Sequence, residues 1–294
     1  MSVAVLLTPE HPDGVEVDPT RPQLLLTDQA ATRGDGVFET LLFRHGRVRE
    51  QDAHLRRLAA SADALELPLP AEERWRAALS LALGRFHEGA GEGAEASIRL
   101  TASRGAEGSG GTFWVVVSPV SRSAATAHGP EDGLRVVLLD RGYDAAAAER
   151  APWLLAGAKT LSYAVNMAAQ RWARNHGADD AIFVTSDGRV LEGPTSSVLI
   201  ARRSPGGAVT LLTPELETGI LAGTTQAAAF EVAREAGWSL GYGPLTPADL
   251  FAADAVWLVS SVRLAAAVTR IDGTEVPCDA ELHRVLVEGL DAAL

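Results

Sequence analysis

The sequence is poor in cysteine and has no apolar run of membrane-spanning length. Its only cysteine, Cys278, cannot form an intramolecular disulfide, which fits a reducing compartment. A transmembrane helix needs about 20 consecutive apolar residues, and no segment reaches that length. The apolar residues 3–7 follow no basic region and are soon followed by Pro9, which is not the pattern of a signal peptide. We therefore expect a cytoplasmic globular protein that does not bind membranes.

Positive charge is also in short supply. The chain has 26 Lys and Arg residues against 38 Asp and Glu residues, which gives a formal net charge of −12. Such a chain is repelled by a phosphate backbone, so we expect no nucleic-acid partner. At 294 residues the chain is long enough to bury a large core and is expected to form two domains.

Lysine is the scarcest charged residue. Lys159 is the only one, so 26 − 1 = 25 of the basic residues are arginine. A position that needs a primary amine cannot accept arginine, because a guanidinium stays protonated and cannot act as a nucleophile or base. A desolvated amine can lose its proton and bond covalently to an aldehyde. From the lysine alone, a required amine and a leftover surface lysine remain equally good interpretations.

The residues that follow Lys159 favour a required amine. Residues 161–173 carry apolar side chains at helical spacing. Residues 181–185 and 190–192 predict a hairpin around the turn Ser186-Asp187-Gly188, and residues 197–201 predict another strand. The lysine thus precedes a helix, and a glutamate ends a strand some thirty residues later.

This pattern, K-x-L-S-Y…GADDAIFV…G-x-V-x-EG-x-T-S-S-x-L, resembles the fold-type IV pyridoxal-phosphate enzymes, the class IV aminotransferase family. The family includes branched-chain aminotransferases, D-amino-acid aminotransferases and 4-amino-4-deoxychorismate lyases. The resemblance runs from about Asp28 to Ala267. It implies an α/β fold with α+β character, two domains with pyridoxal 5′-phosphate between them, and a homodimer.

The domain boundary is predicted from residues 119–133, which are small and polar and lack apolar periodicity. We interpret them as a linker. It separates an N-terminal α/β domain, residues 1–118, from a C-terminal α/β domain, residues 134–294, which carries Lys159.

Three cofactor roles follow from the resemblance, because pyridoxal phosphate draws electrons into its ring to stabilise a carbanion. Lys159 would hold the aldehyde and move a proton, as the catalytic residue. Glu192 would keep the ring nitrogen protonated, since a buried carboxylate beside a cation stays ionised. Tyr163, four residues after Lys159 on the same face of the predicted helix, would either contact the cofactor or simply pack.

The phosphate would be bound by residues from two segments. A predicted helix, with Asp52 as its N-cap, runs to Leu65 and carries H-L-R-R-L. The resemblance implies that Arg57 of this motif binds the phosphate; the alternative is a solvated helix face. Residues 216–226 supply glycines and hydroxyls before a helix predicted from Ala227, a pattern typical of a phosphate cradle but also of simple capping. The hydroxyl residues implied here are Thr224, Thr225 and Ser261. The family has arginine where this chain has Gln226, which argues against a charge role there.

The substrate side begins with GDGVFET, a tight turn at residues 34–36 followed by a strand. The resemblance places Phe38 and Thr40 near the cofactor or substrate, whereas Glu39 belongs to the opposite face of an alternating strand. Three arginines, Arg99, Arg104 and Arg263, are candidates for binding substrate carboxylates. Ordinary surface positions are at least as good an interpretation for the first two. No metal site is predicted.

The reaction is predicted from the same motifs. KTLSYAVN, GDGVFET and SSVR look most like the aminodeoxychorismate lyases, which implies conversion of 4-amino-4-deoxychorismate to 4-aminobenzoate and pyruvate in folate biosynthesis. The alternative is a class IV aminotransferase that acts on branched-chain or D-amino acids, since both share Lys159 and Glu192. A non-catalytic binding protein on this scaffold is a third possibility, which the presence of both residues disfavours.

Overall fold

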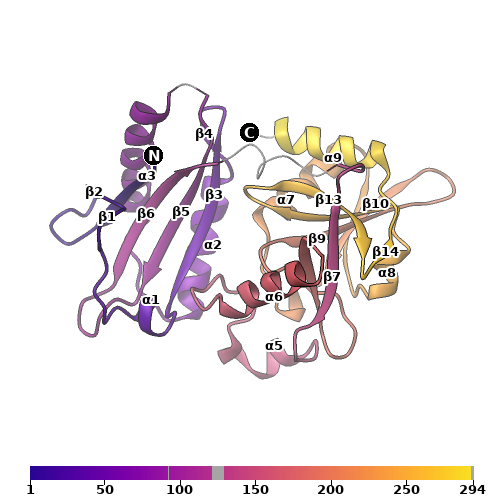
Figure 1. Ribbon diagram of the computed structural model, residues 1–294, viewed down its shortest axis with the longest axis horizontal. Coiled ribbons are helices and arrows are strands. Elements are labelled where there is room, and N and C mark those ends of the chain that lie inside the picture. The colour runs from indigo at the N-terminus through magenta and orange to yellow at the C-terminus, as the bar shows by residue number, and fades with distance from the viewer. Residues whose placement is uncertain (92, 121–128, 293–294) are drawn as a thin grey trace. The chain divides into compact units, whose positions relative to one another are not determined.

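The structure, a computed structural model, describes residues 1–91, 93–120 and 129–292. The described residues form two compact units, coloured along the chain in Figure 1. Unit 1 contains the chain up to residue 120 together with Ala158–Tyr163. Unit 2 contains residues 129–157 and 164–292. Each unit has its own sheet and helices, which confirms the predicted α/β class.

Unit 1 is built on a six-stranded sheet with the order β2-β1-β6-β5-β3-β4, in which neighbouring strands are antiparallel. Its strands are β1 (Val3–Leu7), β2 (Val15–Val17), β3 (Gly36–Arg44), β4 (Arg47–Val48), β5 (Ala96–Ser103) and β6 (Thr112–Pro119). Its helices are α1 (Gln29–Thr32), α2 (Gln51–Ala64) and α3 (Glu72–Ala90).

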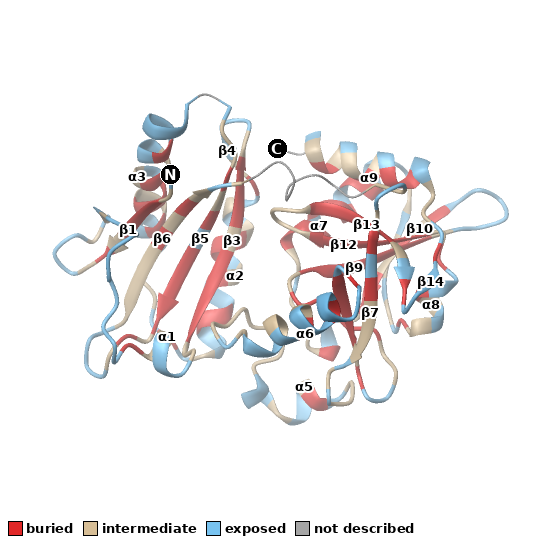
Figure 2. Ribbon diagram, in the orientation of Figure 1, coloured by how far each residue is buried: buried red, intermediate tan, exposed pale blue. Residues whose placement is uncertain are grey.

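Helices α2 and α3 cover one face of this sheet because the strands alternate. On β3, Val37, Leu41 and Phe43 join a core cluster that includes Leu58 of α2 and Trp75 of α3. Figure 2 shows β3 and β5 largely buried, β6 mostly intermediate, and the outer turns of α3 exposed. The opposite face of β3 carries the side chains at even positions.

Unit 2 is built on an eight-stranded mixed sheet with the order β11-β10-β9-β12-β13-β7-β8, to which β14 adds at β13. Its strands are β7 (Leu134–Asp140), β8 (Asp180–Val184), β9 (Ser197–Arg203), β10 (Val209–Pro214), β11 (Ser239–Gly243), β12 (Ala255–Ser260), β13 (Leu264–Ile271) and β14 (Thr274–Glu275). Its α-helices are α5 (Ala147–Arg150), α6 (Ala164–Asn175), α7 (Thr224–Glu235), α8 (Pro247–Phe251) and α9 (Ala280–Ala292). Two 3₁₀ turns, η1 (Pro152–Leu154) and η2 (Leu216–Thr218), complete the unit.

Both faces of the unit 2 sheet are buried. Helices α7 and α9 pack on one face around Trp257, and α8 lies over the other face, where Ile182, Val256 and Leu258 meet. Short apolar runs such as AVWLVS therefore become strands that are covered on both sides.

The strands predicted at residues 181–185 and 197–201 are confirmed as β8 and β9, whereas residues 190–192 make only an isolated bridge, Val190 to Val184, and form no strand. Three helices begin elsewhere than expected. Helix α2 begins at Gln51 after Glu50, whose φ of 48° is left-handed, so the predicted cap Asp52 is wrong. Helix α7 begins at Thr224, three residues before the predicted Ala227, because Gly223 already serves as its N-cap. Helix α6 begins at Ala164 rather than Leu161, since Thr160 bridges to Val37 of β3 and the Leu161 amide donates to the Gly36 carbonyl.

The lysine segment and the linker need separate comment. Lys159 was predicted within a domain of residues 134–294, whereas Ala158–Tyr163 packs with unit 1 because it pairs with the edge of β3. The predicted linker 119–133 includes residues 121–128, which lie outside the described residues, so its bounds remain a prediction. None of the helices in the described ranges is long and apolar enough to cross a membrane.

Candidate functional site

Lys159 is held by main-chain hydrogen bonds at the edge of strand β3. The amide of Phe38 donates to the carbonyl of Lys159 at 3.0 Å, and the amide of Leu161 donates to the carbonyl of Gly36 at 2.7 Å. On the other side, the Lys159 amide donates to Oγ of Ser61 on α2 at 3.0 Å. A strand edge and a helix thus fix the backbone of the only lysine, and sequence reasoning missed Ser61.

Gly36 is required where the lysine segment meets the strand. A Cβ at this position would lie 2.4 Å from the carbonyl oxygen of Ala102 and 2.7 Å from Leu161, so any side chain would push the two segments apart. The neighbouring turn is joined to the same segment, since Ser162 Oγ donates to the Gly34 carbonyl at 3.2 Å. The GDG turn therefore provides room and an anchor for the lysine segment.

The amine of Lys159 lies among aromatic rings. Its Nζ is 4.7 Å from the ring centroid of Phe38 and 5.7 Å from that of Tyr163, and the two rings meet edge to face at 5.2 Å. The prediction that Tyr163 shares a helix face with Lys159 is wrong, because the helix begins only at Ala164. The non-helical segment nevertheless brings Tyr163 near the amine, beside Phe38.

Arg57 forms an ion pair with a fully buried carboxylate. Its Nε and Nη2 donate to Glu39 at 2.7 and 2.8 Å, and His54 Nδ1 lies 2.7 Å from the same carboxylate. Arg56 is exposed, as expected for the neighbouring residue on the helix. Arg57 is therefore oriented within unit 1 by Glu39, on the helix-covered face of β3.

The charges of this cluster are set by burial and hydrogen bonding. Burial alone would raise the pKa of Glu39, but the hydrogen bonds from Arg57 and His54 lower it to about 2. Burial lowers the pKa of His54, against the opposing effect of Glu39. At neutral pH the cluster is a carboxylate and a guanidinium beside a neutral imidazole.

The opposite face of β3 carries the predicted substrate residues. Phe38 pairs in register with Thr101 of β5, and Thr40 pairs with Arg99. The Arg99 guanidinium lies 3.8 Å from the Phe38 ring centroid, in cation–π contact. Thr101 Oγ1 is buried without a hydrogen-bond partner in the described residues. Because residues two apart on a strand share a face, the candidate Arg99 could have identified Thr101 as a further residue of this face from the sequence.

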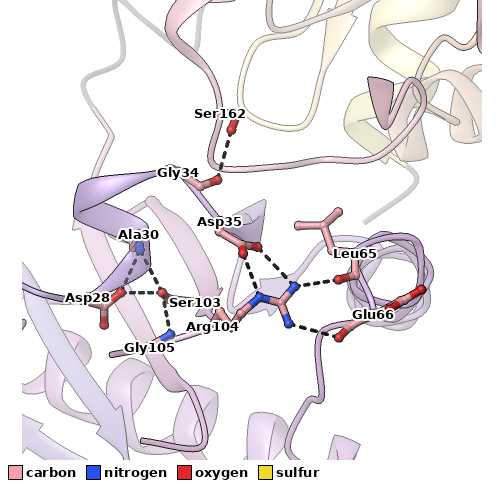
Figure 3. A network of polar contacts seen from close by, with 10 residues as sticks. All are labelled: Asp28, Ala30, Gly34, Asp35, Leu65, Glu66, Ser103, Arg104, Gly105 and Ser162. Carbon is pink, nitrogen blue, oxygen red and sulfur yellow. Dashed lines mark hydrogen bonds and ion pairs between the residues drawn. The ribbon is translucent and has the colours of Figure 1, made fainter. Parts of the chain in front are cut away.

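Arg104 is used to hold loops together. Figure 3 shows its guanidinium directed at Asp35 of the GDG turn and at the end of α2. Nε donates to Asp35 at 2.7 Å, and the Nη atoms donate to the carbonyls of Leu65 and Glu66 at 2.7 and 3.2 Å. This network accounts for Arg104 without a substrate.

In unit 2, Glu192 lies at the end of the predicted hairpin. The Phe183 amide donates to its carbonyl at 2.9 Å, and its Oε2 accepts the Leu221 amide at 3.2 Å. Phe183, Leu191 and Ile220 form a small apolar cluster beside it. The carboxylate is half-buried in an apolar setting, which suits an acceptor for a protonated ring nitrogen.

The first turn of α7 forms a cradle in unit 2. Gly223 is the N-cap, its residue position offers no side-chain cap, and Thr224 and Thr225 are buried. A Cβ on Gly223 would lie 2.4 Å from Ser197 Oγ, so a larger residue there would displace the Ser197 hydroxyl. Such a helix start favours an anion through its N–H groups and dipole.

The other polar groups of unit 2 are Gln226, Ser261 and Arg263. Gln226 is buried; its Oε1 accepts from Tyr242 at 3.3 Å, and its Nε2 has no partner within the described ranges. Ser261 begins the turn between β12 and β13, and is half-buried. Arg263, in the same turn, donates to the buried Asp180 at 2.9 Å.

The comparisons with known proteins agree with this chemistry. The sequence pattern described as "Amino-transferase class IV" matches residues 36–271. A Mycobacterium tuberculosis protein named bifunctional aminodeoxychorismate lyase / D-amino acid transaminase is 48% identical over 285 residues, covering 96% of this chain and 97% of the relative.

Two solved structures have the same fold. A hypothetical aminotransferase from Mycobacterium tuberculosis, in a PLP-bound form, has a TM-score of 0.89 at 46% identity and covers 100% of this chain and 98% of its own. A fold IV-transaminase from Curtobacterium pusillum has a TM-score of 0.89 at 42% identity, with 99% and 97% covered. These likenesses extend over both units.

The buried ion pair generates a stability prediction. We expect Glu39→Gln to lower the free energy of unfolding at pH 7 by roughly 3 kcal/mol, because it leaves Arg57 without its carboxylate. Since the folded-state pKa of Glu39 is lowered to about 2 from 4.5, the wild-type advantage exists above pH 4.5 and fades as the pH falls towards 2. Urea denaturation at several pH values measures it.

The matched control is Glu72→Gln, which breaks an exposed i,i+4 pair with Arg76 and should cost less than about 1 kcal/mol. Equal stability of Glu39→Gln and the wild type at pH 7 would contradict the role given to the buried pair.

Proposed function

Because the chain belongs to the amino-transferase class IV family, we propose that it is a pyridoxal-phosphate enzyme that releases pyruvate from 4-amino-4-deoxychorismate. The observation that carries this proposal is the placement of Lys159. The only lysine of the chain is fixed by its main chain on both sides and presents its amine to aromatic rings. A second activity, transamination of D-amino acids, is favoured by the relative that is named for both reactions.

The residues of the chain fit the cofactor. Gly223 lets the start of α7 approach Ser197 closely, and Gln226 contributes a buried amide without a partner in the described ranges. Lys159 offers the amine and Glu192 the carboxylate. When bound, pyridoxal phosphate supplies an electron-accepting ring that stabilises negative charge on the carbon next to the substrate nitrogen.

The phosphate would be held by neutral and charged donors together. The first turn of α7 offers backbone N–H groups beside Thr224 and Thr225, and Ser261 offers a hydroxyl. Arg57 would add a guanidinium whose orientation is set by Glu39. Glu39 is thus a positioning residue for Arg57 rather than a group that touches the cofactor.

The lysine and glutamate do the proton work in this proposal. The Lys159 amine, once released from the aldehyde, would carry a proton between carbon atoms of the substrate, which pyruvate loss and ring aromatisation require. Glu192 would keep the ring nitrogen protonated, because an ionised carboxylate stabilises an adjacent cation. The rings of Phe38 and Tyr163 would exclude water from the amine.

Of the three candidate arginines, Arg99 has the best placement for a substrate carboxylate. Arg104 is bound by Asp35 and two carbonyls, and Arg263 is bound by Asp180. Arg99 has no carboxylate partner in the described parts of the chain and lies over Phe38, whose ring also faces Lys159. We therefore assign Arg99 to a substrate carboxylate, with Thr40 beside it.

Two wider properties are part of the proposal. We propose that the protein works as a homodimer and in the cytoplasm, where it would contribute 4-aminobenzoate to folate biosynthesis. The family resemblance supports the homodimer, and the single cysteine is compatible with a reducing compartment.

The reaction is tested by product release. With aminodeoxychorismate and no keto-acid acceptor, we expect the purified enzyme to release pyruvate and 4-aminobenzoate in equal amounts. With D-alanine and 2-oxoglutarate, we expect slower formation of pyruvate and glutamate. Coupled lactate dehydrogenase and chromatography measure both. No pyruvate from aminodeoxychorismate, together with turnover of leucine and 2-oxoglutarate, would replace the lyase with a branched-chain aminotransferase.

The arginine assignment predicts a difference between two variants. Arg99→Gln should raise the KM for aminodeoxychorismate by roughly tenfold or more, because a charge-assisted hydrogen bond to the substrate is lost. Arg104→Gln should lower stability but change KM by less than about threefold, since its bonds are internal. Steady-state kinetics with saturating cofactor decides. An unchanged KM for Arg99→Gln, with a raised KM for Arg104→Gln, would reverse the assignment.

A further inference from the structure

Asp180 is a fully buried carboxylate at the start of β8 that the proposed reaction does not use. Its Oδ2 accepts from Arg263 at 2.9 Å, and its Oδ1 accepts from the Ala181 amide at 3.0 Å and from Gln170 at 3.4 Å. Two residues further on, Ile182 belongs to the core between the sheet and α8. Asp180 therefore holds Arg263 from the buried side of the strand.

Arg263 ends a turn with an unfavourable backbone. Residues 261–263 connect β12 to β13, and Ser260 pairs with Leu264 across the turn. Leu264 has a φ of 63°, a left-handed conformation that a bulky side chain rarely adopts. Such a conformation persists only where surrounding contacts impose it. Burial of Leu264 is one such contact, and the ion pair of Arg263 is another.

The same aspartate is linked to the loop that follows Glu192. Gln170 of α6 donates to Thr195 Oγ1 at 3.3 Å as well as to Asp180. One turn earlier on α6, Asn166 donates to the carbonyl of Pro194 at 2.7 Å. Hydrogen bonds thus join the turn that contains Ser261 to the loop after Glu192, all within unit 2.

We propose that Asp180 and Arg263 are positioning residues for the cofactor phosphate. Their ion pair holds the turn of residues 261–263 in place ahead of the left-handed Leu264, and this turn presents the Ser261 hydroxyl to the phosphate. Arg263 then acts through the turn and does not bind a substrate carboxylate. This inference rests on the proposed function, because it assumes that pyridoxal phosphate is the ligand.

The experiment compares two ligands that differ only in the phosphate. Dissociation constants of the apoprotein for pyridoxal phosphate and for pyridoxal are measured by absorbance and fluorescence titration. For Asp180→Asn we expect the dissociation constant for pyridoxal phosphate to rise roughly tenfold and that for pyridoxal to change less than about twofold. A parallel loss of affinity for both ligands would indicate a merely structural role and would overturn the proposal.

The chain supplies a matched control in the preceding residue. Asp179 pairs with Arg135 on the surface, with the two side chains 38% and 55% exposed, so Asp179→Asn should leave both dissociation constants unchanged. The double variant Asp180→Asn/Arg263→Gln should be no worse than either single variant, because both changes remove the same ion pair. Additive losses would contradict a shared role.

Substrate kinetics separate this proposal from the earlier assignment of Arg263. With saturating cofactor, Arg263→Gln should leave the KM for aminodeoxychorismate within about twofold of wild type. A raised KM, with an unchanged ratio of the dissociation constants for pyridoxal and pyridoxal phosphate, would instead indicate that Arg263 binds the substrate. If the wild-type apoprotein bound neither ligand, the proposed function itself would fail, whereas equal discrimination in wild type and Asp180→Asn would overturn this inference alone.

Discussion

The pairing of the lysine segment with the edge of β3 is the constraint on which the proposed site depends. Two main-chain hydrogen bonds to β3 and one to Ser61 leave the backbone of Lys159 little freedom. A catalytic amine at the end of a flexible side chain gains precision mainly from a fixed backbone, because ordering it beforehand removes an entropic cost from the reaction. The requirement for glycine at position 36 follows from the same close approach.

Helix α2 supports this constraint from the other side. His54, Arg57 and Ser61 are spaced at i, i+3 and i+7 and lie on one stripe of the helix. The first two bind Glu39 of β3, and the third binds the amide of Lys159. One polar stripe within an otherwise apolar interface therefore fixes the position of α2 against both the strand and the lysine segment. A buried charge pair of this kind contributes specificity of placement more than net stability.

The distribution of ion pairs also sorts the arginines. Arg104 and Arg263 close internal networks around turns, and Arg57 is oriented by a carboxylate from the adjacent strand. Arg99 instead lies on an aromatic ring. Nearly every basic residue of this chain is arginine, so residue type alone says little about role. The partner of each guanidinium distinguishes an arginine that stabilises a turn or loop from one that can bind the substrate.

The sequence predicted the strands, the GDG turn and the family well, because alternation and turn chemistry are local. It did not predict that residues 161–163 lie outside the helix, since the helical pattern there is overridden by pairing with a strand more than a hundred residues earlier. It could not assign partners to Arg104 or Arg263 either, because Asp35 and Asp180 are distant in the chain. Strand alternation correctly separated Phe38 and Thr40 from Glu39, but the ion pair of Glu39 with Arg57 is a tertiary contact.

The central claim, that Lys159 holds the cofactor, is tested most directly by reductive labelling. The protein is loaded with pyridoxal phosphate, reduced with borohydride, digested and mapped by mass spectrometry. Because the chain has a single lysine, only Lys159 and the N-terminal amine compete for the label. The account predicts a phosphopyridoxyl group on the peptide that contains Lys159, and none on that peptide in Lys159→Arg. A label confined to the N-terminus, or no label at all, would contradict it.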